Sequence, residues 1–324
     1  ITTNKIRLGF TRYGNLRNIV VAEVNFYYYD SLEDDILALY ADDLHTVLRE
    51  DVTEETIDAL QKRLDTRDEK SGEYHSERII LQRELDNARG LLGSSFNDVV
   101  EINPQITAAK DRHLKFGGLN AWQPLGITAY EGESLVVYVG HNSLRTGANS
   151  ALQLVATQYH AEAGSFASVV ANLKVGRNEI TMPSLQSLAC EGGGALYIQY
   201  TGNNANDRYA VRVSGGSSYP VLRLYSVSDE EKNRRIQTYV QELSAYVQEL
   251  STKHEELHKN SENENVNYSY DAQECILNLT DIQTDQMMFS LPASQVLAGL
   301  SENREERLSQ NVKAMEDMLT LFYQ

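Results

Sequence analysis

The sequence is poor in features that would point to several classes of protein. Its two cysteines, Cys190 and Cys275, lie far apart and form no CxxC pair, so neither a disulfide framework nor a thiolate metal site is indicated. Whether the two meet in space stays open. No window approaches the roughly 18 consecutive apolar residues of a membrane span. The start has no initiator Met and no signal-peptide pattern, so we expect an excerpt of a longer protein.

Basic residues are also scarce. The chain has 29 Lys plus Arg against 46 Asp plus Glu, a net charge of -17. Affinity for a phosphate backbone comes from cations that neutralise it, so the composition argues against nucleic acid and anionic membranes as partners. At 324 residues and 41 % apolar, the chain is long enough for two or three domains with real cores.

The first third of the sequence changes from strand to helix periodicity. "NIVVAEVNFYYYDS" alternates as a strand does, and it resembles the closing strand of discoidin-like, galactose-binding sandwiches. Apolar residues then recur at helical spacing. They predict one helix over 32–48, a second that opens at Thr53 as N-cap and runs to 64, and a third over 79–92.

The middle of the sequence reads as a series of short strands. Alternating runs separated by Gly, Asn and Ser predict an antiparallel sandwich or jelly roll; these runs are "GITAY", "SLVVYVG", "LQLVATQYH", "NEITM", "GALYIQY", "YAVRVSGG" and "VLRLYS". The glycines of "EGGGALYIQY" precede a strand and no Lys-Ser/Thr follows, which excludes a P-loop. Trp122 and the tyrosines of this region can stack on sugar rings or pack in the core.

A long helix follows, with Ser228 as N-cap and Glu231 completing a capping box. Its apolar positions keep to one face by steps of four and three: Ile236, Val240, Leu243, Val247 and Leu250. Beyond this helix, "ILNLTDIQTDQMMFSLPA" predicts two short strands about a turn. Pro292 then opens a helix, and a last amphipathic helix runs to the end of the sequence.

The long helix carries the zinc-peptidase pattern His-Glu-x-x-His at His254, Glu255 and His258. That pattern places two imidazoles on one metal, with the Glu as general base. Here the apolar stripe continues onto His254, leaving Glu255 toward solvent, and no third ligand lies in a favourable segment. We therefore interpret all three residues as structural and assign no catalytic residue and no metal ligand in this chain.

Several segments together resemble the enhancin-like, mucin-degrading zinc metallopeptidases of bacteria (gluzincin mucinases). The segments that carry this resemblance are "DVTEETIDALQKRL", "WQPLGITAYEGESLVVYVG", "LKVGRNEITMP", "GGGALYIQY" and "FSLPASQVLAGL". In that family the catalytic motif follows the serine-leucine-proline segment, whereas "HEELH" precedes it here. The resemblance therefore implies an N-terminal part without the catalytic motif, and a remainder of the catalytic domain beyond Gln324.

The resemblance also implies a domain order within an α+β fold. We expect a strand over 1–30, which resembles the tail of a preceding galactose-binding-like module, and a helical lead-in over 31–120. An antiparallel, jelly-roll-like β-sandwich over 121–227 follows. The segment 228–324 is expected to hold long helices with a small β-hairpin, as the start of the metallopeptidase subdomain.

The function implied is that of a secreted or cell-surface bacterial enzyme that hydrolyses mucin and other host O-glycoproteins. Zinc is implied for the full-length protein and none for this chain, whose role is expected to be structural and substrate-positioning. Two alternatives stay open. One is an active peptidase that uses His254, Glu255 and His258; the other is a carbohydrate-binding or adhesion module without protease activity.

Overall fold

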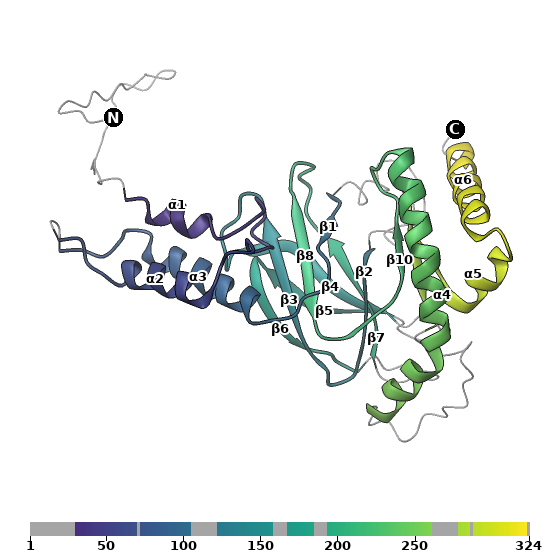
Figure 1. The fold of residues 1–324 in the computed structure, drawn as a ribbon, viewed down its shortest axis with the longest axis horizontal. Coiled ribbons are helices and arrows are strands. Elements are labelled where there is room, and N and C mark those ends of the chain that lie inside the picture. The colour runs from purple at the N-terminus through teal and green to yellow at the C-terminus, as the bar shows by residue number, and fades with distance from the viewer. Residues whose placement is uncertain are drawn as a thin grey trace, which may run out of the picture.

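The computed structural model describes residues 30–69, 72–104, 122–157, 167–184, 193–260, 278–285 and 288–322. The predicted opening strand and both cysteines lie outside these residues. The described chain is elongated, with helices α1 to α3 at one end, β-sheets in the middle and α4 to α6 at the other end (Figure 1). The fold is α+β with antiparallel sheets. Among the described helices, none combines the length and apolar character that a membrane crossing needs.

The first helix is much shorter than the sequence predicts. Helix α1 spans Leu32–Leu37, so the predicted helix over 32–48 is wrong. After α1 the chain turns around Asp42, whose carboxylate accepts hydrogen bonds from the backbone N–H groups of Thr46 (2.8 Å) and Val47 (2.9 Å). A short acidic side chain that bonds to nearby backbone competes with the helix. The chain reverses there, and Tyr40 pairs with Leu48 in an isolated antiparallel bridge.

The second and third predicted helices are confirmed as α2 (Glu54–Leu64) and α3 (Arg78–Leu92). The Thr53 side chain accepts a hydrogen bond from the Thr56 backbone N–H at 3.4 Å, as an N-cap does. Buried apolar residues of α1, α2 and α3 form one cluster, which also takes in Tyr138 from the neighbouring sheet. The three helices therefore pack as one layer against the end of that sheet.

Two antiparallel sheets form the middle of the molecule. One has four strands in the order β1-β8-β3-β6, and the other has five in the order β5-β4-β7-β2-β9. Inward side chains of both sheets join in a single buried cluster, so the sheets pack face to face around one core. The strands are β1 (Val100–Ile102), β2 (Trp122–Tyr130), β3 (Ser134–His141), β4 (Asn149–Thr157), β5 (Ala167–Lys174), β6 (Gly176–Thr181), β7 (Gly193–Tyr200), β8 (Tyr209–Ser214) and β9 (Ser217–Ser218).

The strand pattern differs from the prediction at three places. Strand β1 lies in the region that the sequence indicates as helical, and β5 corresponds to no predicted run. "VLRLYS" does not join the antiparallel strands: β10 (Val221–Arg223) pairs in parallel with β11 (Thr280–Gln283). Strand β12 (Met288–Leu291) completes this third sheet. Apolar packing explains why β10 lies in this third sheet, because Leu222 and Leu224 are buried in the cluster beneath α4.

The C-terminal helices follow the predicted pattern. Helix α4 spans Asp229–Asn260, and Ser228 Oγ accepts a hydrogen bond from the Glu231 backbone N–H at 3.3 Å. Its predicted stripe faces the third sheet and joins an apolar cluster with α5 (Ala293–Leu300) and α6 (Arg304–Phe322). The predicted hairpin is present as β11 and β12, and Pro292 stands at the N-cap of α5.

Candidate functional site

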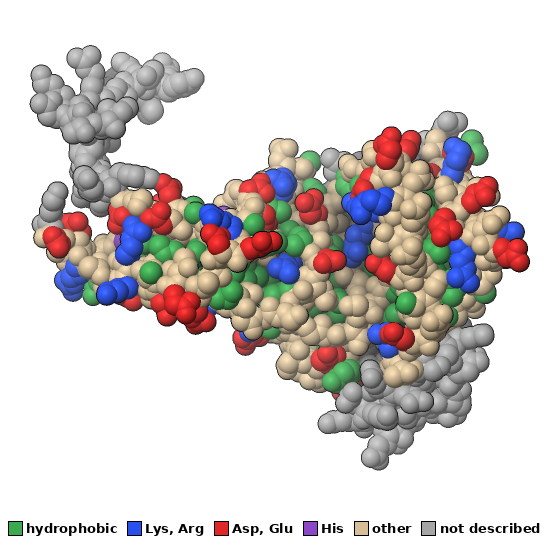
Figure 2. Space-filling model, viewed as in Figure 1, with side chains coloured by type: hydrophobic (Ala, Val, Ile, Leu, Met, Phe, Trp, Pro, Cys, Tyr) green, Lys and Arg blue, Asp and Glu red, His purple; other side chains and the backbone are tan. Residues whose placement is uncertain are grey.

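A groove of about 810 Å³ runs between helix α4 on one side and the start of β1, the middle of β2 and strand β10 on the other. Figure 2 shows the surface hollowed beside α4, with acidic and basic side chains around the hollow. The volume falls within the range of roughly 300–1,000 Å³ that is usual for small-molecule sites. Among the pockets of the described residues, we take this one as the candidate site because of the charged groups that line it.

Side-chain packing and one close approach of backbone fix the walls of the groove. One wall is α4, which is anchored by its buried stripe and by a hydrogen bond of 2.7 Å between the hydroxyls of Tyr239 and Thr280 of β11. The opposite wall is the segment that leads into β1, together with β2 at Gly126, where the backbone φ is +76°. A Cβ at Gly126 would lie 3.3 Å from the Tyr219 carbonyl oxygen, so glycine permits the close approach of the two segments.

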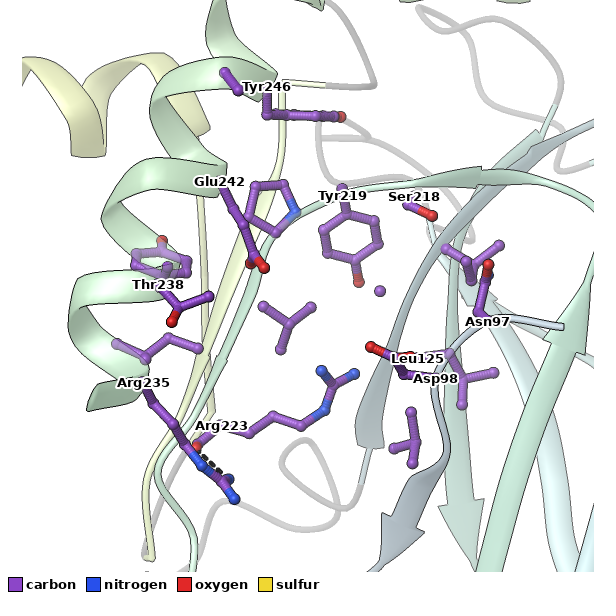
Figure 3. Close-up of a pocket in the computed structure, with 18 of the residues that line it drawn as sticks. Asn97, Asp98, Leu125, Ser218, Tyr219, Arg223, Arg235, Thr238, Glu242 and Tyr246 are labelled. Atoms are coloured by element: carbon purple, nitrogen blue, oxygen red, sulfur yellow. Dashed lines mark hydrogen bonds between the residues drawn. The ribbon is translucent and has the colours of Figure 1, made fainter. Parts of the chain in front are cut away.

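Arg223 projects from β10 into the groove (Figure 3). Its Nη2 donates a hydrogen bond to the Pro124 carbonyl at 2.9 Å. Its Nε atom is buried and makes no hydrogen bond with the described residues. Burial lowers the pKa of Arg223 below its ordinary value, although Tyr219 and Asp281 oppose that change. Arg223 therefore holds an unused hydrogen-bond donor beside the groove, which is an unusual state for a buried polar atom.

Two carboxylates face the same space from opposite walls. Asp98 belongs to the segment before β1 and Glu242 to α4, and both residues are exposed. Burial and the nearby charge of Asp98 raise the pKa of Glu242, while Arg223 acts in the opposite direction. Among the ion pairs of the described residues, none joins Arg223 to either carboxylate. The groove thus presents two carboxylates, and the Arg223 Nε atom lies buried beside it without a bond to either.

A buried carboxylate lies behind the groove. Asp281 of β11 is fully buried and accepts hydrogen bonds from the hydroxyls of Tyr219 (2.5 Å), Tyr197 (3.1 Å) and Ser290 (2.6 Å). Burial raises the pKa of Asp281, although the three hydroxyls oppose that change. Because its oxygens are already bonded, Asp281 is not free to react. Its role is to hold Tyr219, which lines the groove, and Tyr197 of β7 in place.

The predicted site residues lie at the far end of the same helix. Backbone around His254, Glu255 and His258 is helical, and their side chains lie outside the description. The structural interpretation of these three residues therefore stays a prediction. Lys253, the preceding residue, lines the groove. Trp122 packs against the cluster beneath α4, with its ring 6.2 Å from that of Tyr197, which favours the packing role over sugar stacking.

The residues of the described chain do not fit a zinc site. No group of three or more His, Cys, Asp or Glu side chains in the described ranges is arranged to hold a metal ion. A structural or catalytic zinc needs three or four such ligands around one point. We therefore derive no chemical step through zinc from these residues.

Sequence reasoning did not find the groove residues. Arg223 lies between the buried residues Leu222 and Leu224 in an otherwise apolar segment. A charged residue at such a position is the signal in the sequence that could have pointed to this site. Asp98 and Glu242 carry no comparable signal, because acidic residues in a loop and on an exposed helix face are common. Only the approach of α4 to the strands brings the three together.

The fold is similar to that of solved metallopeptidase structures. A structure of the CBM32-1, CBM32-2 and M60 catalytic domains of ZmpB from Clostridium perfringens matches 89 % of this chain at 21 % identity, with a TM-score of 0.51. This chain spans 28 % of the length of that one. The sequence matches no protein-family model and no curated protein.

Two further structures are similar at lower scores. The M60 catalytic domain of ZmpC from Clostridium perfringens, solved in complex with the sialyl T antigen, matches 68 % of this chain and 40 % of its own at 20 % identity and a TM-score of 0.42. A metallopeptidase from Bacteroides thetaiotaomicron matches 85 % of this chain and 38 % of its own at 15 % identity and a TM-score of 0.40. The similar structures thus include metallopeptidases, two of them with M60 domains.

Proposed function

We propose that this chain is the N-terminal part of a secreted zinc metallopeptidase that acts on mucin-type O-glycosylated proteins. The observation that carries the proposal is the fold likeness over 89 % of the chain to a structure that contains an M60 catalytic domain. The sequence resemblance to enhancin-like mucinases supports it independently, because it rests on short segments and their order. Fold alone does not define an activity, so the role of this chain is argued from its surface.

The proposed role of this portion is structural and substrate-positioning. The two face-to-face sheets serve as a sandwich that holds α4, and α4 and the strands form the groove. Segment 228–324 is proposed as the start of the catalytic subdomain, after a helical lead-in over 31–120 and the sandwich over 121–227. Catalytic zinc chemistry is placed outside this chain, and His254, Glu255 and His258 are proposed to be structural.

The proposal is tested by separating glycoprotein binding from cleavage. The purified chain, supplied with equimolar zinc, is passed over immobilised submaxillary mucin and in parallel incubated with soluble mucin, which is then examined by electrophoresis. We expect retention on mucin, weaker retention on the enzymatically deglycosylated protein, and no cleavage.

Two other outcomes would favour the alternatives. Cleavage that disappears in the Glu255→Ala variant would make His254, Glu255 and His258 a working site and overturn the assignment. Retention together with a downstream gene sequence that encodes no further His-Glu-x-x-His motif would favour the carbohydrate-binding or adhesion module. Absence of retention would remove the substrate-positioning role.

A further inference from the structure

The fully buried carboxylate of Asp281 connects separate parts of the fold. It lies on β11, the middle strand of the third sheet. Its hydrogen-bond donors are the hydroxyls of Ser290 on β12, of Tyr219 in the segment between β9 and β10, and of Tyr197 on β7. The bond from Tyr197, 3.1 Å long, joins the five-stranded sheet to the third sheet. The contact between these two sheets therefore includes a group that can gain or lose a proton.

The donors around Asp281 can serve both of its protonation states. A hydroxyl donates to a carboxylate, and it can also turn and accept from a protonated carboxyl group, whereas a backbone N–H can only donate. The Ser290 hydroxyl lies 2.6 Å from Asp281 Oδ1 and 3.5 Å from the Tyr197 hydroxyl, so it can accept from Asp281 and donate to Tyr197. The network can thus hold a proton and keep its hydrogen bonds.

The surroundings of Asp281 do not neutralise a negative charge by direct contact. A buried charge is costly unless it is ion-paired as well as hydrogen-bonded. Arg223 of β10 acts on Asp281 through its charge, but it donates instead to the Pro124 carbonyl, and the described residues form no ion pair with Asp281. The titratable groups that face it from other elements are phenols, which supply no positive charge: Tyr197, Tyr219 and, from α4, Tyr239. Burial therefore outweighs the hydroxyls and raises the pKa of Asp281.

We propose that Asp281 is a pH-sensitive switch that holds the third sheet, and with it α4, on the five-stranded sheet more strongly in acid than at neutral pH. In the protonated state the network is neutral and keeps its hydrogen bonds, and in the ionised state it retains a buried charge. Helix α4 depends on this sheet because the Tyr239 hydroxyl bonds to that of Thr280, the residue before Asp281, at 2.7 Å. The stability of the helix that walls the groove therefore varies with pH.

The sign of the pH dependence follows from the state that holds the proton more tightly. Because the pKa of Asp281 is raised in the folded protein, the folded protein keeps this proton to higher pH than the unfolded chain does. The stability tied to Asp281 is complete below about pH 4, where an ordinary aspartate is protonated, and is lost as the pH rises through the folded pKa. A carboxylate held by an ion pair would show the opposite dependence.

The test is urea unfolding of the full chain at about pH 5 and about pH 8, followed by the fluorescence of Trp122. Trp122 is the single tryptophan of the chain, and its ring lies 6.2 Å from that of Tyr197 in the same apolar cluster, so its emission reports on this junction. Asp281→Asn keeps the shape of the side chain and stays neutral, as the protonated acid is. From the lower to the higher pH, the unfolding constant of the wild type should rise about fivefold relative to that of Asp281→Asn.

Two further variants make the test specific to the buried carboxylate. Asp285→Asn is the matched control, because Asp285 is an exposed carboxylate soon after the same strand and accepts the Ser226 N–H at 2.6 Å, a role that asparagine keeps. This variant should follow the wild-type pH profile. Ser290→Ala removes a hydroxyl that favours the ionised form of Asp281, so it should move the loss of stability to higher pH.

Four results would overturn the inference. They are parallel pH profiles of the wild type and Asp281→Asn, a wild type that instead loses stability relative to this variant in acid, a Ser290→Ala profile that does not move, and a change in Asp285→Asn as large as that in Asp281→Asn. If Asp281→Asn does not fold, the direction in which Ser290→Ala moves the profile decides.

Discussion

The two ends of the β-sheet region are joined to their helices in different ways. At one end, helices α1 to α3 and the turn after α1 press directly onto β3 and β8: the Tyr138 hydroxyl donates to the His45 carbonyl at 2.9 Å, and Arg212 donates to the Thr46 carbonyl at 3.1 Å. At the other end, α4 packs on the third sheet through a shared apolar cluster and the hydrogen bond of 2.7 Å between Tyr239 and Thr280, and the groove separates it from β1 and β2.

The difference indicates that the two junctions have different roles. The first junction uses backbone carbonyls as its acceptors, and a Cβ placed on Gly140 would lie 2.2 Å from the Leu44 carbonyl oxygen, so no side chain fits there unless backbone shifts. The second junction leaves Arg223, Asp98 and Glu242 without mutual bonds. A closely packed junction stabilises the fold, and an open one with unused polar groups is suited to binding.

The largest effect is expected at the closely packed junction. Gly140→Ala should lower the free energy of unfolding by about 3 kcal/mol, because the new methyl group meets backbone that cannot shift. Urea denaturation followed by circular dichroism measures the loss. Gly299→Ala in α5 is the control, since its Cβ would meet no atom within 4 Å, and it should stabilise by up to about 1 kcal/mol. Equal effects of the two substitutions would contradict the contrast.

The next effect concerns the network behind the groove. Tyr219→Phe removes the shortest hydrogen bond to buried Asp281 and should lower the free energy of unfolding by about 2 kcal/mol. Tyr197→Phe removes longer bonds, of 3.1 and 3.3 Å, and should lower it by about 1 kcal/mol. The same urea titrations rank the two variants. A larger loss for Tyr197→Phe would mean that Tyr219 does not carry the network.

A smaller effect is expected at the start of the helix that walls the groove. Ser228→Ala removes the N-cap of α4 and should lower the free energy of unfolding by about 1 kcal/mol. Thr53→Ala removes the corresponding cap of α2 at the other end, where the hydrogen bond is 3.4 Å long. Thermal melts of both variants compare the two ends. No measurable loss in either would show that the caps do not stabilise these helices.

The smallest effect is a pH dependence at the closely packed junction. Burial lowers the pKa of His141, although Asp207 opposes that change. As the pH falls, the His141 imidazole therefore takes up a proton at higher pH in the unfolded chain than in the folded protein. The stability tied to His141 is complete above about pH 6.5 and falls as the pH drops toward the folded pKa.

The His141→Asn variant tests this dependence. The His141 Nδ1 atom accepts the backbone N–H groups of Ser143 (3.0 Å) and Leu144 (2.8 Å), and an asparagine oxygen can take over that role without titrating. Between about pH 8 and pH 5.5 the variant should lose less stability than the wild type in urea titrations. Parallel pH profiles of the two proteins would show that His141 is not the group responsible.

The sequence was informative where local signals agree. The capping box at Ser228 and Glu231, the stripe of α4 and the hairpin before Pro292 were all found, because each depends on neighbours along the chain. The predicted helix over 32–48 is wrong because the Asp42 carboxylate accepts hydrogen bonds from backbone N–H groups a few residues further along the chain. Strand β1 is three residues long, too short for a periodic signal. Arg223, Asp98 and Glu242 come together only through tertiary packing.

The parallel pairing of β10 with β11 has a consequence for how the groove can change. These strands precede and follow α4 in the sequence, so α4 is the crossover between two paired strands. Five residues separate the end of β10 from the start of α4, so the start of this groove wall is tied to the paired strands. Substitutions of side chains along the wall would change what lines the groove without changing where α4 begins.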